Sequence, residues 1–394
     1  MNAEYRFIEP VDVLYLRGNR LFGEGGEHAE ALMPPWPSLF AGALRSRILV
    51  DRGVNLASFA QKGEADDDVI RILGTPKSPG PFRIAHVSLA RRINGGVEWF
   101  MPVPSDVVIF DRGTSGSNPK LEIHRLAALD LTAIRPVVIS NPGPRAPLLR
   151  AAGPGKPEPG YLISMHGWLA YLQGKDLSAE QFIHHSKLWK NDRRLGIALN
   201  FHSRTAAEGR IYTTDAVAMC KDCGFLVGVQ NSGGLLPANG LIRLGGDGRG
   251  ASMEKISSES LPEYLPHGPI FRMILMTPGV FADGWIPPGL IRENGDFCLS
   301  YRGFKARLVA SAVSRYEVAS GWDIAAQKPK PALRLTPAGS VYWFERLGGD
   351  ICVLKDLLEE GLWPLIAQDP GHAPAAALES QRRAEGFNNV WFGE

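Results

Sequence analysis

The sequence predicts an α+β fold of two domains, mainly from the order of its expected strands and helices, and three observations on its length and composition agree with this prediction. The chain has 394 residues, which is enough for two or three domains of about 150 residues each. Its hydrophobic content of 44% supports a sizeable core. Its 44 glycines and 30 prolines indicate many loops and few long helices, so we expect short strands and helices between turns.

The first predicted elements are a strand and a helix. Residues 5–16 form the expected strand, because apolar and polar residues mostly alternate there, and a glycine-rich loop follows at residues 18–26. The segment PPWPSLFAGALRSRIL, residues 34–49, predicts a helix that begins after its prolines. Ser38 is expected to cap the free N–H groups of its first turn.

This helix has two distinguishable faces. Its apolar residues recur every four positions, at Phe40, Leu44 and Ile48. Another face carries Ser38, Gly42 and Arg45. A helix N-terminus, a small residue that permits close approach and an arginine together suit a phosphate. An ordinary amphipathic helix with a proline entry explains the same pattern, so both interpretations stay open.

The middle of the chain predicts insertions and a domain boundary. Residues 51–160 are expected to hold long inserted loops, and residues 141–159 are especially rich in proline and glycine. We expect an N-terminal domain over residues 1–255 that contains these insertions. A C-terminal domain is expected over residues 256–394.

Residues 181–212 form the most basic segment of the chain. Its cations are Lys187, Lys190, Arg193, Arg194, Arg204 and Arg210, and they alternate with Phe182, Trp189, Phe201, His202 and Tyr212. Aromatic rings stack on unpaired bases while cations hold phosphates, so the mixture favours single-stranded nucleic acid. A solvated hairpin whose arginines pair with neighbouring carboxylates is the alternative.

A glycine-rich turn, LGGDGRG, occupies residues 244–250. Consecutive glycines permit positive φ and expose N–H groups that can line an anion-binding concavity. The spacing matches neither a dinucleotide-binding fingerprint nor a phosphate-binding P-loop. A tight turn with only a packing role explains it equally well.

The C-terminal third predicts a recognisable order of elements. Strands are expected at residues 270–276, 305–318, 333–344 and 387–392, and a helix that Asp350 caps and Gly361 ends is expected before the last of them. The loop at residues 321–331 carries Trp322, Lys328 and Lys330. This order resembles a ferredoxin-like unit whose first helix, between residues 277 and 305, is poorly marked. Two such units fit the length of the chain.

Five segments occur in an order that resembles a known family. They are PPWPSLFAGALRSRIL, RRLGIALNFHSRTAAEGRIY, LIRLGGDGR, ILMTPGVFADGWIP and GWDIAAQKPKPALRLTPAGSVYWFE. Together they resemble the RAMP subunit of the type III-B (Cmr) CRISPR effector that binds the 5′ tag of the guide RNA. Asp247 stands where this family usually has Glu, and residues 386–391 match its C-terminal glycine-rich element only in part.

The resemblance implies two ferredoxin-like (RRM-like) domains and a non-catalytic role in antiviral defence. The implied partners are the 5′ tag of the guide RNA, the large polymerase-like subunit and the first backbone RAMP subunit. The residues expected to contact the RNA, or to support that contact, are Ser38, Gly42, Arg45, Arg194, Arg204, Gly245, Gly246, Gly248, Arg249, Lys328 and Lys330.

Two other functions remain open from the sequence. Related RAMP proteins cut precursor guide RNA without a metal, and such an endoribonuclease needs a general acid and base. His28 is the nearest candidate here, while His184 and His185 lie in the basic segment without defined roles. A scaffold that touches RNA little, with Trp36, Trp322 and Trp391 as protein anchors, is the third possibility.

The net charge limits the kind of partner, and the cysteine content indicates the compartment. The formal net charge is only +2, although arginines (30) outnumber lysines (13), so an anionic partner must meet a local basic surface. No stretch has the ~20 apolar residues of a membrane span, and four cysteines favour a reducing cytoplasm. Cys220 and Cys223 form a single C-x-x-C, with Cys298 and Cys352 isolated, so neither a metal site nor another cofactor is expected.

Overall fold

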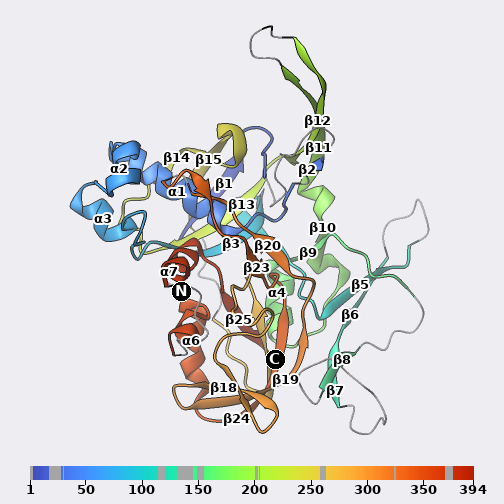
Figure 1. The fold of residues 1–394 in the computed structure, drawn as a ribbon. Coiled ribbons are helices and arrows are strands. Elements are labelled where there is room, and N and C mark those ends of the chain that lie inside the picture. The colour runs from blue at the N-terminus through green and yellow to red at the C-terminus, as the bar shows by residue number, and fades with distance from the viewer. Residues whose placement is uncertain are drawn as a thin grey trace.

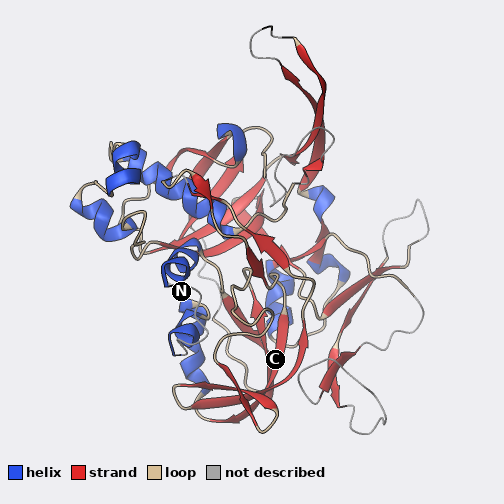
Figure 2. Ribbon diagram, viewed as in Figure 1, coloured by secondary structure: helices blue, strands red, loops and turns tan. Residues whose placement is uncertain are grey.

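The chain forms a mixed α/β protein with mainly antiparallel strands (Figure 2). The computed structural model describes residues 3–16, 28–29, 31–113, 120–130, 145–148, 155–199, 203, 205–257, 263–323, 325–368 and 376–394. Seven α-helices and two large sheets lie within these residues. The predicted α+β class is therefore confirmed.

The larger sheet has eight strands in the order β10-β9-β4-β3-β13-β1-β15-β14. They are β10 (Phe182–His184), β9 (Tyr161–Ser164), β4 (Gly96–Pro102), β3 (Arg83–Ile93), β13 (Cys223–Gln230), β1 (Glu4–Pro10), β15 (Gly250–Ile256) and β14 (Asn239–Arg243). All neighbouring pairs are antiparallel. The central strand β13 is buried along its whole length. The region expected to hold insertions, residues 51–160, thus supplies β3 and β4 to this sheet.

The second sheet has six antiparallel strands in the order β17-β18-β19-β24-β16-β25. They are β17 (Leu290–Glu293), β18 (Asp296–Tyr301), β19 (Phe304–Ala312), β24 (Val341–Gly348), β16 (Ile270–Leu275) and β25 (Val390–Gly393). The predicted strand at residues 333–344 is in fact two, β23 (Leu333–Leu335) and β24, because a turn with Gly339 at φ +85° separates them.

The two sheets share a strand order. Four strands of the larger sheet run β15-β1-β13-β3 and four of the second run β25-β16-β24-β19, which in chain order is fourth, first, third, second in both cases. Helices α1 (Pro37–Asp51), α2 (Leu56–Lys62) and α3 (Asp67–Leu73) connect the first of these strands to the second in the larger sheet. In the other sheet, η4 (Ile351–Leu354), α5 (Lys355–Glu360), α6 (Trp363–Gln368) and α7 (Ala376–Glu385) connect the third strand to the fourth. Within the described residues, α-helices occur only in the first-to-second connection of the larger sheet and only in the third-to-fourth connection of the other.

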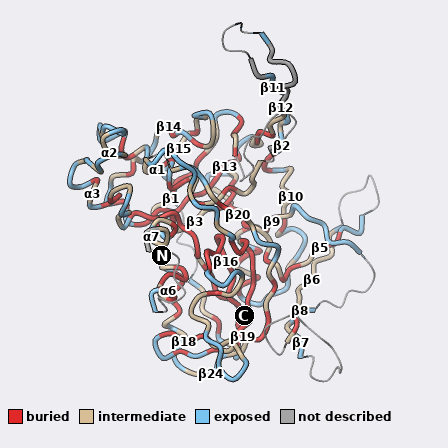
Figure 3. Tube along the Cα trace, in the orientation of Figure 1, coloured by how far each residue is buried: buried red, intermediate tan, exposed pale blue. Residues whose placement is uncertain are grey.

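One hydrophobic core joins the two sheets, and Figure 3 shows the buried segments in the middle of the molecule. Trp391 of β25 lies between Trp99 of β4, at 6.2 Å between ring centroids, and Trp168 of α4 (Met165–Leu172), at 5.7 Å. A second cluster packs α1 on the larger sheet, with Phe40 5.1 Å from Phe225. The predicted apolar stripe of this helix is completely buried, at Phe40, Leu44 and Ile48.

The helix caps agree with the sequence at one end of the chain and not at the other. The Asp350 carboxylate accepts a hydrogen bond from the Cys352 N–H at 2.9 Å, and α5 ends at Gly361 with φ +69°, as predicted. The expected Ser38 cap is wrong: α1 already begins at Pro37, so Trp36 takes the cap position without a side-chain hydrogen bond. A proline can occupy the first helical position because its missing N–H would have no partner there.

Several hairpins extend from this body. The longest pairs β11 (Trp189–Leu199) with β12 (Ala206–Met219), and β2 (His28–Ala29) joins it in parallel at Thr213 and Thr214. This hairpin projects far from the body in Figure 1. Two more pair β5 (Val107–Asp111) with β6 (Leu121–Arg125), and β7 (Ala127–Asp130) with β8 (Arg145–Leu148).

Candidate nucleic-acid interface

Tyr15 lies against residues from two distant parts of the chain. The guanidinium carbon of Arg249 lies 5.0 Å from the centroid of the Tyr15 ring, and the N–H of Gly246 donates to the Tyr15 carbonyl at 2.9 Å. Arg194 of β11 lies close enough to Tyr15 for the tyrosine to influence its pKa. Predicted site residues that are more than 50 positions apart in the sequence therefore meet at one tyrosine. We call Tyr15, Arg194, residues 245–248 and Arg249 the Tyr15 cluster.

The glycine turn of this cluster, η3 (Gly246–Gly248), requires its glycines. Gly245 has φ +79°, and a Cβ there would lie 2.8 Å from the Tyr15 carbonyl oxygen, so the turn can approach Tyr15 only without a side chain. Asp247 also has positive φ, at 57°. Gly248 has φ +63°, and a Cβ added there would meet nothing within 4 Å, so its surface is open.

The two arginines of the Tyr15 cluster are ion-paired but accessible. Arg249 contacts Asp12 at 2.7 Å and its side chain is 28% exposed, while Arg194 contacts Asp192 at 2.8 Å and is 41% exposed. The hydrogen bond to Asp192, and to a smaller extent the nearby Tyr15, raises the pKa of Arg194 above the ordinary arginine value. Ion pairs this exposed contribute little stability, so a phosphate can replace the carboxylate at small cost.

The base of the long hairpin adds further cations beside this cluster. Lys187 and Lys190 are exposed at its beginning, and Arg193 pairs with Asp215 at 3.2 Å across the two strands. Arg204, which the sequence also assigned to RNA contact, lies outside the described residues. For His28 the structure describes the backbone in β2 and not the side chain.

A second group of predicted residues meets at Glu385 of α7 instead. Lys330 contacts the Glu385 carboxylate at 2.6 Å and Arg382 contacts it at 2.8 Å, and all three side chains are largely buried. Arg45 lies close enough for Glu385 to raise its pKa, although burial dominates and lowers it overall. The Arg45 guanidinium donates to the Phe82 carbonyl at 3.2 Å and lies over the Phe82 ring. Arg45 and Lys330 thus lie in the contact between α1, α7 and the loop after β22 (Lys328–Pro329).

The remaining predicted residues are at the surface. Gly42 is exposed on α1, where an added Cβ would meet nothing within 4 Å, and Ser38 lies half-buried one turn earlier. Lys328 is exposed in β22, which pairs with β21 (Trp322–Asp323), and the Trp322 side chain is 56% exposed. Sequence reasoning missed Tyr15 and Glu385 as the meeting points, because no local spacing relates either residue to the cations that it contacts.

The adjacent histidines are part of an aromatic stack. The ring centroids of His184 and His185 are 4.4 Å apart, and His185 lies 4.9 Å from Trp189. His184 Nδ1 bonds the Ser186 hydroxyl at 2.8 Å, and burial, with His184 adding to it, lowers the pKa of His185.

The cysteines do not belong to a metal site in the described part of the chain. No group of three or more His, Cys, Asp or Glu side chains there could hold a metal ion, and all four cysteines are free thiols. Burial raises the pKa of Cys223 to about 11, so its thiol stays protonated near neutral pH. None of the described helices combines the length and the apolar character needed to cross a membrane.

The model of one protein family, described as CRISPR-associated protein (Cas_Cmr3), matches residues 6–393. The chain belongs to the Cas_Cmr3 family. This match confirms the resemblance to Cmr-type RAMP subunits that the five sequence segments indicated. No curated protein matches the chain.

Chains of two solved structures share the fold of this chain. One similar chain comes from the type III-B Cmr-beta complex bound to cognate target RNA and AMPPnP, with 15% identity, a TM-score of 0.52, and coverage of 98% of this chain and 96% of that chain. Another comes from the Cmr-beta complex bound to cognate target RNA, with 16% identity, a TM-score of 0.50 and the same coverage. At these identities the likeness establishes a shared fold over almost the whole length.

Proposed function

We propose that this chain is a non-catalytic subunit of a type III-B (Cmr) CRISPR effector complex and that it holds the 5′ repeat-derived tag of the guide RNA at the Tyr15 cluster. The observation that carries the proposal is the convergence of Arg194, Arg249 and the glycine turn on Tyr15. Membership of the Cas_Cmr3 family supports the assignment to such a complex.

The chemistry of the Tyr15 cluster suits an unpaired strand. Two accessible guanidinium groups can each donate two parallel hydrogen bonds to a phosphate. The open surface at Gly248 allows a ribose-phosphate backbone to approach the turn closely. The exposed lysines at the base of the hairpin extend the positive surface. Proteins bind single strands on basic surfaces of this kind without reading the groove of a duplex.

The architecture supports the partner assignment. The shared strand order of the two sheets fits a pair of ferredoxin-like units, each of which has replaced one helical connection by strands. The similar chains come from complexes bound to cognate target RNA, and we extend that association with RNA to this chain. The large polymerase-like subunit and the first backbone subunit are the proposed protein partners.

A direct test compares RNA ligands of one length. Purified protein is titrated with an RNA that carries the repeat-derived 5′ tag, with the same RNA annealed to its complement, and with a scrambled single strand, at several salt concentrations. We expect the single-stranded tag to bind most tightly and the duplex most weakly. Equal affinity for all three RNAs would contradict recognition of the tag.

A further inference from the structure

A polar cleft lies between the larger sheet and the end of α5, away from the Tyr15 cluster. Its volume is about 450 Å³, within the range of ordinary ligand sites. Residues of the larger sheet and of the turn after β13 form one wall, and the end of α5 forms the other. The lining residues are Glu4, Arg83, Val229, Gln230, Asn231, Ser232, Gly233, Glu359 and Glu360.

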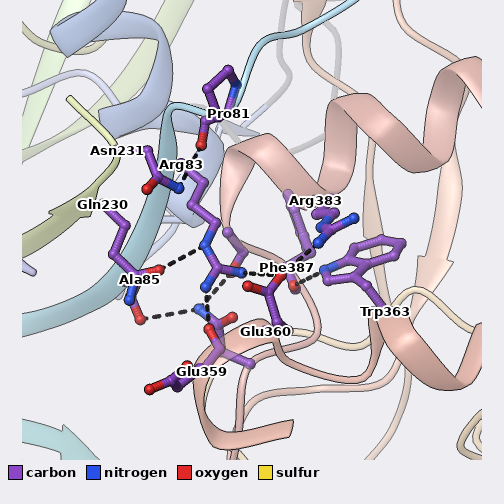
Figure 4. Close-up of polar contacts among 12 residues, drawn as sticks. Pro81, Arg83, Ala85, Gln230, Asn231, Glu359, Glu360, Trp363, Arg383 and Phe387 are labelled. Carbon is purple, nitrogen blue, oxygen red and sulfur yellow. Dashed lines mark hydrogen bonds and ion pairs between the residues drawn. The ribbon is translucent and has the colours of Figure 1, made fainter. Parts of the chain in front are cut away.

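Hydrogen bonds between the two walls hold the cleft in shape (Figure 4). Arg83 is only 8% exposed and donates to the Gln230 side-chain oxygen at 2.7 Å, to the Glu360 carboxylate at 3.2 Å and to the Glu359 carbonyl. Glu360 also pairs with Arg383 at 2.5 Å. Asn231 donates to the Pro81 carbonyl at 3.1 Å. The site is therefore preorganised, and three of the five N–H groups of Arg83 are already used within it.

Two kinds of group remain available to a ligand: carboxylate oxygens that accept hydrogen bonds and one amide N–H group that donates. The Glu359 carboxylate is exposed and accepts no hydrogen bond from the described residues, and within that same part of the chain Glu4 Oε1 is buried without a donor. Gln230 is 8% exposed, and its oxygen must face Arg83 because a guanidinium only donates. Its Nε2 donor is then directed away from Arg83 and has no acceptor among the described side chains and backbone.

We propose that this cleft receives an arginine or lysine side chain of a protein partner. The cation lies between Glu359 and Glu4, and Gln230 Nε2 donates to a backbone carbonyl of the same partner. The Glu359 carboxylate and the second oxygen of Glu4, whose first oxygen pairs with Arg6 at 2.9 Å, complement a cation. The amide donor requires an acceptor on the same ligand. A peptide carries both groups, whereas a polyamine has no acceptor and an RNA phosphate would lie against two carboxylates.

The proposed role in an effector complex identifies the partner as another subunit, but the cleft can be tested on the full chain alone. The probe is N-acetyl-arginine-N-methylamide, with the citrulline analogue as its neutral counterpart and spermidine as a cation without acceptors. Binding to wild-type protein, Glu359→Gln and Gln230→Leu is measured by calorimetry. Glu180→Gln, an exposed carboxylate in η1 (Ala179–Gln181), is the matched control.

We expect the arginine probe to bind the wild-type and Glu180→Gln proteins and to bind Glu359→Gln about tenfold more weakly. The citrulline analogue should not bind, and Gln230→Leu should weaken the arginine probe without affecting spermidine. Absent binding of the arginine probe to wild-type protein, unchanged binding to Glu359→Gln, or spermidine binding as tight as the arginine probe would overturn the inference. Tag-RNA affinity is measured on the same proteins. A loss of RNA affinity in Glu359→Gln would assign this face to RNA instead. If only the variants of the Tyr15 cluster contradict the proposed RNA site, the cleft proposal remains intact.

Discussion

Arg249 lies over the ring of Tyr15, with its guanidinium carbon 5.0 Å from the ring centroid, although 234 positions separate the two residues in the chain (249 − 15). The arrangement fixes a cation beside a half-buried aromatic ring. It also places the glycine turn directly before Arg249 against the Tyr15 carbonyl. This contact is the physical basis of the proposed tag-binding site.

Charge reversal in the Tyr15 cluster should weaken RNA binding. Arg249→Glu and Arg194→Glu each remove a phosphate partner, so we expect about a tenfold loss of tag-RNA affinity and a decrease of about one in the slope of log affinity against log salt. Filter-binding titrations at several salt concentrations measure both quantities. Arg71→Glu on α3 makes the same charge change at another exposed arginine and should have little effect. Equal losses in all three variants would indicate a general charge effect and contradict the assignment.

Two substitutions at Gly42 distinguish an effect on helix stability from an effect on RNA contact. Because nothing lies within 4 Å of a Cβ at this exposed helical position, Gly42→Ala should raise the free energy of unfolding by about 0.5–1 kcal/mol. Gly42→Gln should fold equally well but weaken RNA binding if a phosphate approaches this face of α1. Urea unfolding and RNA titration on the same samples distinguish the two effects. Wild-type RNA affinity in Gly42→Gln would remove α1 from the interface.

The two lysines predicted to contact RNA should behave differently. Lys330 pairs with buried Glu385, which keeps Arg382 as a second partner, so Lys330→Ala should destabilise the protein by about 2 kcal/mol. Lys328 is exposed, and Lys328→Ala should change stability by less than about 0.5 kcal/mol. Urea denaturation measures both changes. Any loss of RNA affinity in folded Lys328→Ala then reports a direct contact, and similar stability losses in both variants would contradict this separation.

His86 should make stability depend on pH. Its complete burial lowers its pKa to about 3, from an ordinary 6.5 in the unfolded chain. Between these two values the unfolded state binds a proton that the folded state does not. The free energy of unfolding should therefore fall as the pH drops through this window, by up to about 1.4 kcal/mol for each pH unit.

The variant His86→Gln tests this dependence. Its free energy of unfolding should fall less steeply than that of wild-type protein between pH 6.5 and about 5, where carboxylates still contribute little. His166→Gln, at an exposed position on α4, is the control and should keep the wild-type dependence. Parallel curves for all three proteins would show that His86 does not titrate as its burial requires.

The proposed non-catalytic role predicts that repeat RNA stays intact. Purified protein incubated with labelled repeat RNA in the presence of a chelator should give no defined product, because metal-independent cleavage needs a positioned general acid and base and the proposed role uses neither. Gel analysis after prolonged incubation is sufficient. A single cleavage that His28→Ala abolishes would instead establish a metal-independent ribonuclease.

The sequence by itself determined the elements whose signals are local. The apolar repeat of α1, the cap at Asp350 and the stop at Gly361 all depend on residues within a few positions of each other, and the structure confirms them. The Ser38 cap was wrong because a proline at the first helical position moved the beginning of α1 by local sterics. The family resemblance was also readable, because it depends on ordered segments rather than on contacts.

Only the tertiary structure decided which cations share a surface. Arg45, Lys330, Arg194 and Arg249 have the same chemistry in the sequence, yet the first two lie around buried Glu385 and the last two lie, accessible, at Tyr15. The difference arises from long-range packing of α7 against α1 and of the glycine turn against Tyr15, which follows the first strand. Charge acts through distance and burial, and neither is specified by the spacing of residues along the chain.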